Sequence, residues 1–404
     1  MNTTLVEKAA CHLDVLCRRV GNRAVGSRGN REATEFFERT ASSFGWEIET
    51  DALDVVDWDG GAAGLTFRGD SFHVQASPYS RGCSIEEAEL VRVSSVHELE
   101  RAELRGKAVL LHGEIAREQL MPKNFIFYNP ESHRMIISLL EHKNPAVIIC
   151  ATGRNSALAG GAYPFPLIED GDFDIPSVYM TDVEGARLLA HSGGMVTIRS
   201  SAARRPDKAF NVTALRRVSG AKRIVLTAHI DAKKGTPGAI DNATGVVILL
   251  LAAELLRDYT GGFQLELAAF NGEDYYAVPG QMDFIRKNEG RFGGIMLNIN
   301  IDGAGYMEGD TAFSFYGTPD HVRETAEGVI REASGAVTGP EWPQGDHSIF
   351  MQYGVPAIAV SSLWLTAGME TQALTHTEAD NPDIVDCEKT AAAARMIAEI
   401  VRRL

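Results

Sequence analysis

The segment Arg223-Ile-Val-Leu-Thr-Ala-His229-Ile-Asp231 is an apolar run that passes directly into a histidine and an aspartate. A short apolar run of this kind is typical of a buried strand in a parallel sheet. In an open parallel sheet, ligands bind in the crevice outside the carboxyl ends of the strands. The segment therefore predicts an α/β fold in which His229 and Asp231 lie at a ligand-binding edge.

Two later apolar runs, 263–270 and 294–301, repeat this order. The first is followed by Glu273 and Asp274, and the second by Asp302. Neighbouring parallel strands would bring all these side chains into one crevice. Because like charges a few ångströms apart oppose ionisation, protons or cations must neutralise the cluster. The pattern therefore predicts a bound pair of divalent metal ions.

Composition limits the class of protein. A chain of 404 residues is long enough for two or three domains, and 45% hydrophobic with 23% charged residues supports well-packed cores. The net charge of -15 argues against a nucleic-acid partner, which needs a basic surface. Five scattered cysteines indicate reduced thiols. A secretory signal is not visible, and the apolar run 245–253 is too short to span a bilayer, so we expect a cytoplasmic protein without a membrane partner.

The spacing of apolar residues divides the chain into regions. Helical spacing covers 4–20 and 31–44, and strands alternate with helices from 211 onward. Short β-type runs and two helices fill the middle, which ends in a polar stretch, 200–207, that reads as a linker. We expect one domain from 1–51 and 206–404, with a mostly parallel twisted sheet flanked by helices. A smaller mixed β/α domain, 52–205, would be inserted in it.

Asp241 precedes a strongly apolar helix in the segment Asp241-Asn-Ala-Thr-Gly245. One reading is a helix N-cap, for which aspartate is a preferred residue. The other is a carboxylate that bridges two metals, held in place by the cap geometry. Both readings stay open at this point.

Late in the chain, His376 lies in a loop before the C-terminal helix and could return a second imidazole to the crevice.

The remaining candidates have supporting roles. Asp231 could accept the proton of the second ring nitrogen of His229, as carboxylates behind metal-bound imidazoles do. Glu273 and Asp274 are adjacent, so their side chains diverge, and one can hold a metal while the other acts as a general base on water. Asp346 and His347 begin a short helix and could support the ligands or donate to the oxyanion of the transition state.

Taken together, these segments resemble the M28 family of two-zinc aminopeptidases. The resemblance covers 211–404 and implies that Asp241 bridges the metals. His229 and Asp302 would complete one site, and Asp274 and His376 the other. Glu273 would be the general acid and base. Two Zn²⁺ ions are implied, with Co²⁺ or Mn²⁺ as alternatives, and the middle region looks like a protease-associated domain.

The chain departs from the family pattern at Asp274, where a glutamate is more common. The implied activity is hydrolysis of the N-terminal peptide bond of a peptide or aminoacyl substrate. A carboxypeptidase or a deacylase of amino-acid conjugates is the alternative within enzymes, and Arg204, Arg205 and Arg286 are the arginines that a carboxypeptidase could use. A non-catalytic receptor-like homologue is a third reading, and a homo-oligomer stays open.

Overall fold

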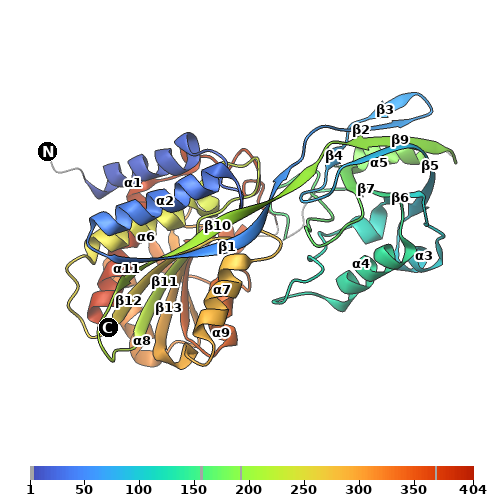
Figure 1. Ribbon diagram of the computed structural model, residues 1–404. Helices are drawn as coiled ribbons and strands as arrows, with labels where there is room; N and C mark the ends of the chain where they lie inside the picture. Colours follow the sequence, from blue (N-terminus) through green and yellow to red (C-terminus); the bar gives the residue numbers. More distant parts are fainter. Residues whose placement is uncertain (1–3, 155–157, 192, 369–370) are drawn as a thin grey trace. The chain divides into compact units, whose positions relative to one another are not determined.

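The computed structural model describes residues 4–154, 158–191, 193–368 and 371–404 (Figure 1). The chain forms two compact units. The first unit comprises the residues up to 55 together with 208–404, and the second unit comprises 56–207. Each unit has its own sheet and its own hydrophobic core.

The first unit is built on an eight-stranded sheet with the order β1-β10-β12-β11-β13-β16-β14-β15. The four neighbours β12, β11, β13 and β16 run parallel, whereas β10 and β14 are antiparallel to β12 and β16. The sheet is therefore mixed, with a parallel centre. Its strands are β1 (Glu47–Asp59), β10 (Ala203–Arg216), β11 (Arg223–His229), β12 (Gln264–Phe270), β13 (Ile295–Ile301), β14 (Thr311–Tyr316), β15 (Ala336–Thr338) and β16 (Ala357–Ser362).

The register of the central strands determines which residues meet at the carboxyl edge. His229 pairs with Phe270, and Thr227 pairs with Asn300. The strands β11, β12 and β13 therefore end side by side. The residues that follow them, up to Asp231, Asp274 and Asp302, emerge at the same edge of the sheet, as the sequence predicts.

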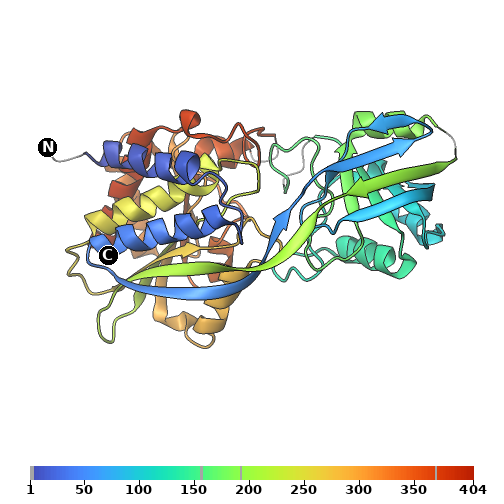
Figure 2. The ribbon, with the colours of Figure 1, turned by 45° about the horizontal axis from the view of Figure 1, so that its top comes forward.

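Helices cover both faces of this sheet (Figures 1 and 2). The helices α6 and α11 lie on one face, where α1 and α2 pack against α6, and α7 and α9 lie on the other. From Thr244 to Ala253, α6 is buried all round. The helices of the unit are α1 (Leu5–Asp14), α2 (Arg28–Ser43), α6 (Thr244–Leu255), α7 (Pro279–Asn288), α8 (Asp320–Glu332), α9 (His347–Gln352), α10 (Leu363–Gly368) and α11 (Cys387–Arg403).

The second unit has another eight-stranded mixed sheet, with the order β3-β2-β9-β5-β6-β7-β8-β4. Separate hydrophobic clusters form its core, and its described residues include the helices α3 (Val96–Arg101), α4 (Glu131–Lys143) and α5 (Asp182–Leu189). Its strands are β2 (Ala63–Phe67), β3 (Asp70–Phe72), β4 (Gln75–Ala76), β5 (Cys83–Val93), β6 (Ala108–Leu111), β7 (Val147–Thr152), β8 (Ser177–Thr181) and β9 (Met195–Ser200). Its kinship with protease-associated domains stays a prediction.

One expectation for the chain is wrong. The stretch 200–207 is not a linker, because β9 continues through Ser200 and β10 begins at Ala203. The charged residues that made it look like a linker lie on a strand that pairs with β1. Arg205 and Lys208 form ion pairs with Asp59 and Asp54 of that neighbour.

Among the described residues, none of the helices is both long and apolar enough to cross a bilayer.

Candidate metal centre

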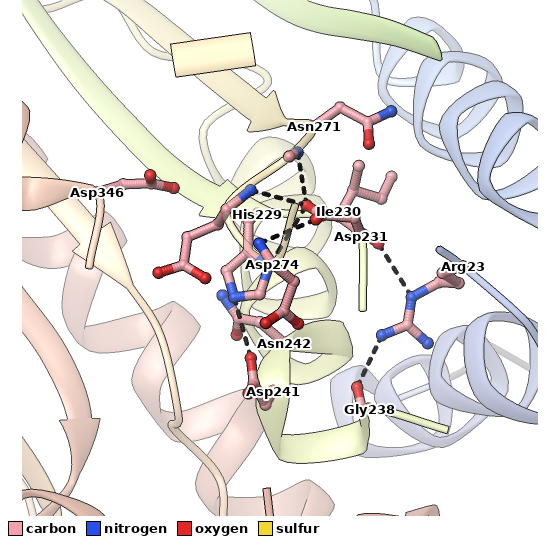
Figure 3. Close-up of polar contacts among 12 residues, drawn as sticks. Arg23, His229, Ile230, Asp231, Gly238, Asp241, Asn242, Asn271, Asp274 and Asp346 are labelled. Atoms are coloured by element: carbon pink, nitrogen blue, oxygen red, sulfur yellow. Dashed lines mark hydrogen bonds and ion pairs between the residues drawn. The ribbon is translucent and has the colours of Figure 1, made fainter. Parts of the chain in front are cut away.

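Asp241 lies between the two histidines that the sequence singled out. Its Oδ1 is 3.1 Å from Nε2 of His229 (Figure 3). Its Oδ2 is 3.1 Å from Nε2 of His376. The two carboxylate oxygens thus face two different imidazoles. His229 ends β11, and His376 belongs to a loop before α11, so the fold brings distant parts of the chain to one carboxylate.

Two further carboxylates complete the arrangement. Asp302 Oδ1 lies 3.7 Å from Nε2 of His229, and Asp274 Oδ1 lies 3.2 Å from Nε2 of His376. One possible ligand atom each from His229, Asp241 and Asp274 lies within 4.8 Å of the others, so these three residues form a candidate metal site. The geometry groups the side chains into two sets that share Asp241, the first with His229 and Asp302 and the second with His376 and Asp274.

His229 is almost completely buried, and neither ring nitrogen has a hydrogen-bond partner of good geometry among the described residues. Burial opposes its protonation, but the carboxylates of Asp231, Asp241 and Asp302 outweigh burial and hold the pKa of the imidazole well above its usual range. The pKa of Asp241 is correspondingly low, because the two histidines overcome the effect of its burial. The cluster thus demands positive charge, as protons or as cations.

Asp231 does not make the hydrogen bond that the sequence suggested. Its Oδ1 lies 3.6 Å from Nδ1 of His229, which is too long for a hydrogen bond. Its carboxylate instead accepts hydrogen bonds from the backbone N–H groups of Gly272, Glu273 and Asp274, at 2.8, 3.3 and 3.0 Å (Figure 3). Asp231 therefore holds the turn that follows β12, and with it the ligand carboxylate of Asp274.

Asp241 is not the N-cap of α6, so the cap geometry does not hold it. Its φ and ψ of -117° and 83° are not helical. The backbone N–H groups of Ile240 and Asp241 donate to the carboxylate of Asp380, at 2.7 and 3.0 Å. Asp380 is fully buried, and burial followed by the charge of Asp241 raises its pKa to about 7. It is a positioning residue that sequence reasoning missed, although it lies four residues after His376 in the same loop.

Asn242 connects this loop to the end of β13. Its side-chain Nδ2 donates to the carbonyl of Ile301 at 2.8 Å, and its Oδ1 accepts from the N–H of Gly245 at 3.0 Å. A Cβ on Gly245 would lie 2.3 Å from Asn242 Oδ1 and 2.6 Å from the Ile301 carbonyl oxygen, so only glycine fits there. The contact fixes the position of Asp241 relative to Asp302.

Arg23, which sequence reasoning also missed, holds the loop from His229 to Asp241. Its guanidinium is completely buried and donates to the carbonyls of Ile230 and Gly238 at 3.0 and 2.7 Å (Figure 3). It donates to the carbonyl of Pro237 at 2.7 Å as well. It also donates to the carbonyl of Leu16. A buried charge satisfied by several carbonyls on one loop fixes the path of that loop. The position of Arg23 in a glycine-rich segment was the feature of the sequence that could have indicated this role.

Glu273 and Asp346 lie in the same acidic environment. Burial, with the charges of Asp274, Asp302 and Asp346, raises the pKa of Glu273 well above its usual value, although His229 opposes this. Burial raises the pKa of Asp346 to about 7. Asp346 accepts from Nε2 of Gln281 at 2.8 Å, which ties it to α7. A support role for Asp346 therefore agrees with the geometry.

His347 has different surroundings. Its ring lies 4.6 Å from each of the rings of Tyr316 and Trp342, and its Nε2 lies 3.1 Å from the carbonyl of Trp342. Burial lowers its pKa to about 4, so it is neutral near pH 7. These contacts are those of a packed aromatic side chain, and they give no support to a role as an oxyanion donor.

The donor set fits divalent metals. Imidazole nitrogens and carboxylate oxygens are zinc ligands, and the same set suits cobalt and manganese. Nε2 of buried His229 lies 3.1 and 3.7 Å from carboxylate oxygens of Asp241 and Asp302 without a hydrogen bond of good geometry, and a bound cation explains this arrangement best.

The model of peptidase family M28 matches residues 211–401. Residues 211–401 belong to peptidase family M28. The match contains all five proposed ligands and Glu273, and it ends within α11.

Two solved structures share the fold of this protein. An aminopeptidase from Aneurinibacillus sp. strain AM-1 superposes with a TM-score of 0.75 over 98% of this chain and 93% of that chain, at 19% identity. The zinc aminopeptidase BSAP from Bacillus subtilis gives a TM-score of 0.74 over 98% and 95%, at 15% identity. At these identities the likeness concerns the fold, and it confirms the α/β class with helices flanking the sheets.

A curated relative is the probable lipoprotein aminopeptidase LpqL of Mycobacterium tuberculosis. It is 22% identical over 293 residues, which are 70% of this chain and 55% of that protein. The chain thus spans about half the length of this relative. The cytoplasmic location expected from the sequence stays a prediction.

Proposed function

We propose that the first unit is a metal-dependent aminopeptidase that hydrolyses the N-terminal peptide bond of peptides with the help of two zinc ions. The observation that carries this proposal is the position of Asp241, with one carboxylate oxygen 3.1 Å from each histidine Nε2. A carboxylate shared in this way can serve two cations at once. Membership of a peptidase family and the zinc aminopeptidase among the similar structures support the same reading.

Five side chains would hold the ions. His229 and Asp302 would hold one, His376 and Asp274 the other, and Asp241 would contribute to both. When bound, two such ions lower the pKa of water and polarise the scissile carbonyl. Asp231, Asp380 and Arg23 would keep the ligands in place through the backbone contacts described above.

Glu273 is the proposed general acid and base. Its carboxylate would accept a proton from the attacking water and then donate that proton to the nitrogen of the leaving amine. Burial, which is the main cause of its raised pKa in the cation-free cluster, supports this role, because a buried carboxylate accepts a proton more readily than an exposed one. The contribution to the rate would be about 10²- to 10⁴-fold.

A free N-terminus is the preferred recognition element. The α-ammonium group of a peptide is attracted to a cluster of carboxylates, whereas a terminal carboxylate is repelled by it. A carboxypeptidase would need an arginine, but Arg286 is paired with Asp283, and Arg204 and Arg205 belong to the second unit with Asp174 and Asp59 as partners. The carboxypeptidase alternative therefore gains no support from these arginines.

The test is turnover of aminoacyl-anilides by wild type and Glu273→Gln, with bound zinc measured on the same samples. We expect the variant to keep its metal and to lose about 10²- to 10⁴-fold in kcat. Full turnover by a metal-loaded Glu273→Gln variant would contradict the role of Glu273. Dipeptides blocked at either end distinguish the substrate class, since an aminopeptidase cleaves only those with a free N-terminus.

A protein that contains no zinc, cobalt or manganese and cleaves none of these substrates would favour the receptor-like homologue. Cleavage of N-acylated amino acids alone would favour a deacylase.

A further inference from the structure

Lys233 lies on the loop between His229 and Asp241 and contacts a proposed metal ligand. Its backbone N–H donates to Asp274 Oδ2 at 3.1 Å, and its Nζ donates to the backbone carbonyl of Asp274 at 2.9 Å. The same Nζ lies 3.8 Å from Asp274 Oδ1. That oxygen is the one 3.2 Å from Nε2 of His376. A fixed positive charge thus sits beside the carboxylate oxygen offered to the second ion.

The two ligand sets consequently differ in charge. Behind His229 of the first set lies the carboxylate of Asp231, with Oδ1 3.6 Å from Nδ1. Beside Asp274 of the second set lies the ammonium of Lys233. An anion behind one ligand strengthens the binding of a cation, whereas a cation beside another opposes it.

Solvent screens this effect only partly. The side chain of Lys233 is 23% exposed and that of Asp274 is 4% exposed. Charges this close together and this little exposed interact much more strongly than ions in bulk water. Asp274 is also one methylene shorter than glutamate, so it has less freedom to reach away from Lys233.

We propose that Lys233 makes the two cation sites unequal, so that the ion held by Asp274 and His376 binds more weakly and exchanges more readily than the ion held by His229 and Asp302. This inference rests on the proposed pair of metal ions. The activity would then follow the free metal concentration through the second site, while the first site stays filled.

A purely structural role for Lys233 predicts the opposite result. If the bond from Nζ to the Asp274 carbonyl mainly orients the ligand, removing it should weaken the second site. The sign of the change therefore separates electrostatic repulsion from positioning.

The experiment is a calorimetric titration of the metal-stripped full-length protein with zinc. The variants are Lys233→Gln, which is neutral and can still donate to the carbonyl, and Lys233→Arg, which keeps the charge. Lys234→Gln is the matched control, since it removes the same charge from the exposed neighbouring residue. Thermal unfolding of each metal-free variant checks that it is folded, and Lys233→Met is a second neutral variant.

For the wild type we expect two binding steps of different affinity. Lys233→Gln should tighten the weaker step about tenfold and change the tighter step much less. Lys233→Arg should keep the wild-type difference, and Lys234→Gln should shift either step by less than about twofold. An unchanged or weakened second step in folded Lys233→Gln and Lys233→Met would overturn the inference. A wild type that binds fewer than two ions would instead overturn the proposed metal pair.

Discussion

The carboxylate of Asp241 gives one oxygen to His229 and the other to His376, and its side chain is only 14% exposed. His229 and His376 each have a high pKa in the absence of cations, because burial is outweighed by carboxylates that include Asp241. A divalent ion bound to each histidine would displace these protons, so metal binding should release protons.

Removal of Asp241 should affect both ions, whereas removal of His376 should affect one. We expect Asp241→Ala to lose both zinc ions and His376→Ala to retain the ion held by His229 and Asp302. The measurement is zinc per chain after gel filtration, by inductively coupled plasma mass spectrometry. Asp258→Ala, at a side chain that is 88% exposed, is the control and should retain both. Equal zinc contents in the Asp241 and His376 variants would argue against a shared ligand.

His12 on α1 should make the protein sensitive to acid. Burial lowers its pKa to about 4, although Glu254 opposes this shift. Between pH 6.5 and about 4 the unfolded chain binds a proton that the folded chain does not, so stability is lost as the pH falls through this window. His12→Phe should therefore show a smaller drop in melting temperature than the wild type between about pH 7.5, above this window, and about pH 4.5, near its lower end.

The control for His12 is His321→Phe, at an exposed position on α8. The comparison is made by thermal unfolding at each pH. If His12→Phe and His321→Phe lose the same number of degrees as the wild type, the burial of His12 does not contribute to the acid sensitivity.

Single residues were predictable from the sequence where they follow a strand directly. His229, Asp274 and Asp302 each stand at or near the end of a short apolar run, and parallel strands bring such positions together. Arg23 and Asp380 were not predictable in the same way. Their roles depend on backbone groups of a distant loop, and a hydrogen bond to a carbonyl or an N–H leaves no mark in the sequence of that loop.

At the scale of elements, the loop from β11 to α6 is irregular, and buried side chains from outside the loop hold its backbone. Arg23 binds carbonyls near both ends of the loop, and Asp380 binds two N–H groups just before Asn242. These contacts replace the helix cap that the sequence suggested for Asp241. A loop held by buried polar groups stays rigid without regular secondary structure.

Replacement of Arg23 by methionine should disrupt this loop. The variant would leave several buried carbonyls without a donor, at a cost of about 1–3 kcal/mol for each group that water cannot reach. We expect a lower melting temperature of the metal-free protein and a weaker zinc affinity. Arg28→Met, at an exposed arginine paired with Glu32 on α2, is the control and should change neither. An Arg23→Met variant with wild-type zinc affinity would show that the guanidinium does not position the ligands.

The strands were more predictable than their connections. The apolar segment 223–229 is recognisable as a strand because almost every residue in it is buried. The segment 200–207 was misread because its arginines, its aspartate and Pro206 interrupt the apolar pattern, while the pairing with β1 makes 203–207 part of a strand. Periodicity reports burial, so it does not detect a strand whose side chains face water.

At the scale of the whole molecule, two compact units have separate cores. All of the proposed ligands, as well as Glu273, Arg23 and Asp380, belong to the first unit. The second unit, 56–207, is reached through β1 and left through β10, which are neighbours in the sheet of the first unit. Metal binding should therefore not require the second unit.

A shortened protein tests this independence. Residues 56–207 are replaced by a short glycine-containing turn that joins β1 to β10. We expect the shortened protein to fold and to bind zinc with the stoichiometry of the full chain, measured by calorimetry and circular dichroism. A shortened protein that is folded but binds no zinc would show that the metal centre depends on the second unit.

The most direct test of the account is anomalous diffraction from crystals of the zinc-loaded protein. We predict two zinc peaks on either side of the Asp241 carboxylate, each about 2.0–2.2 Å from one of its oxygens. One should lie next to His229 and Asp302, and the other next to His376 and Asp274. A single peak, or peaks that do not contact Asp241, would contradict the shared carboxylate on which the proposed function depends.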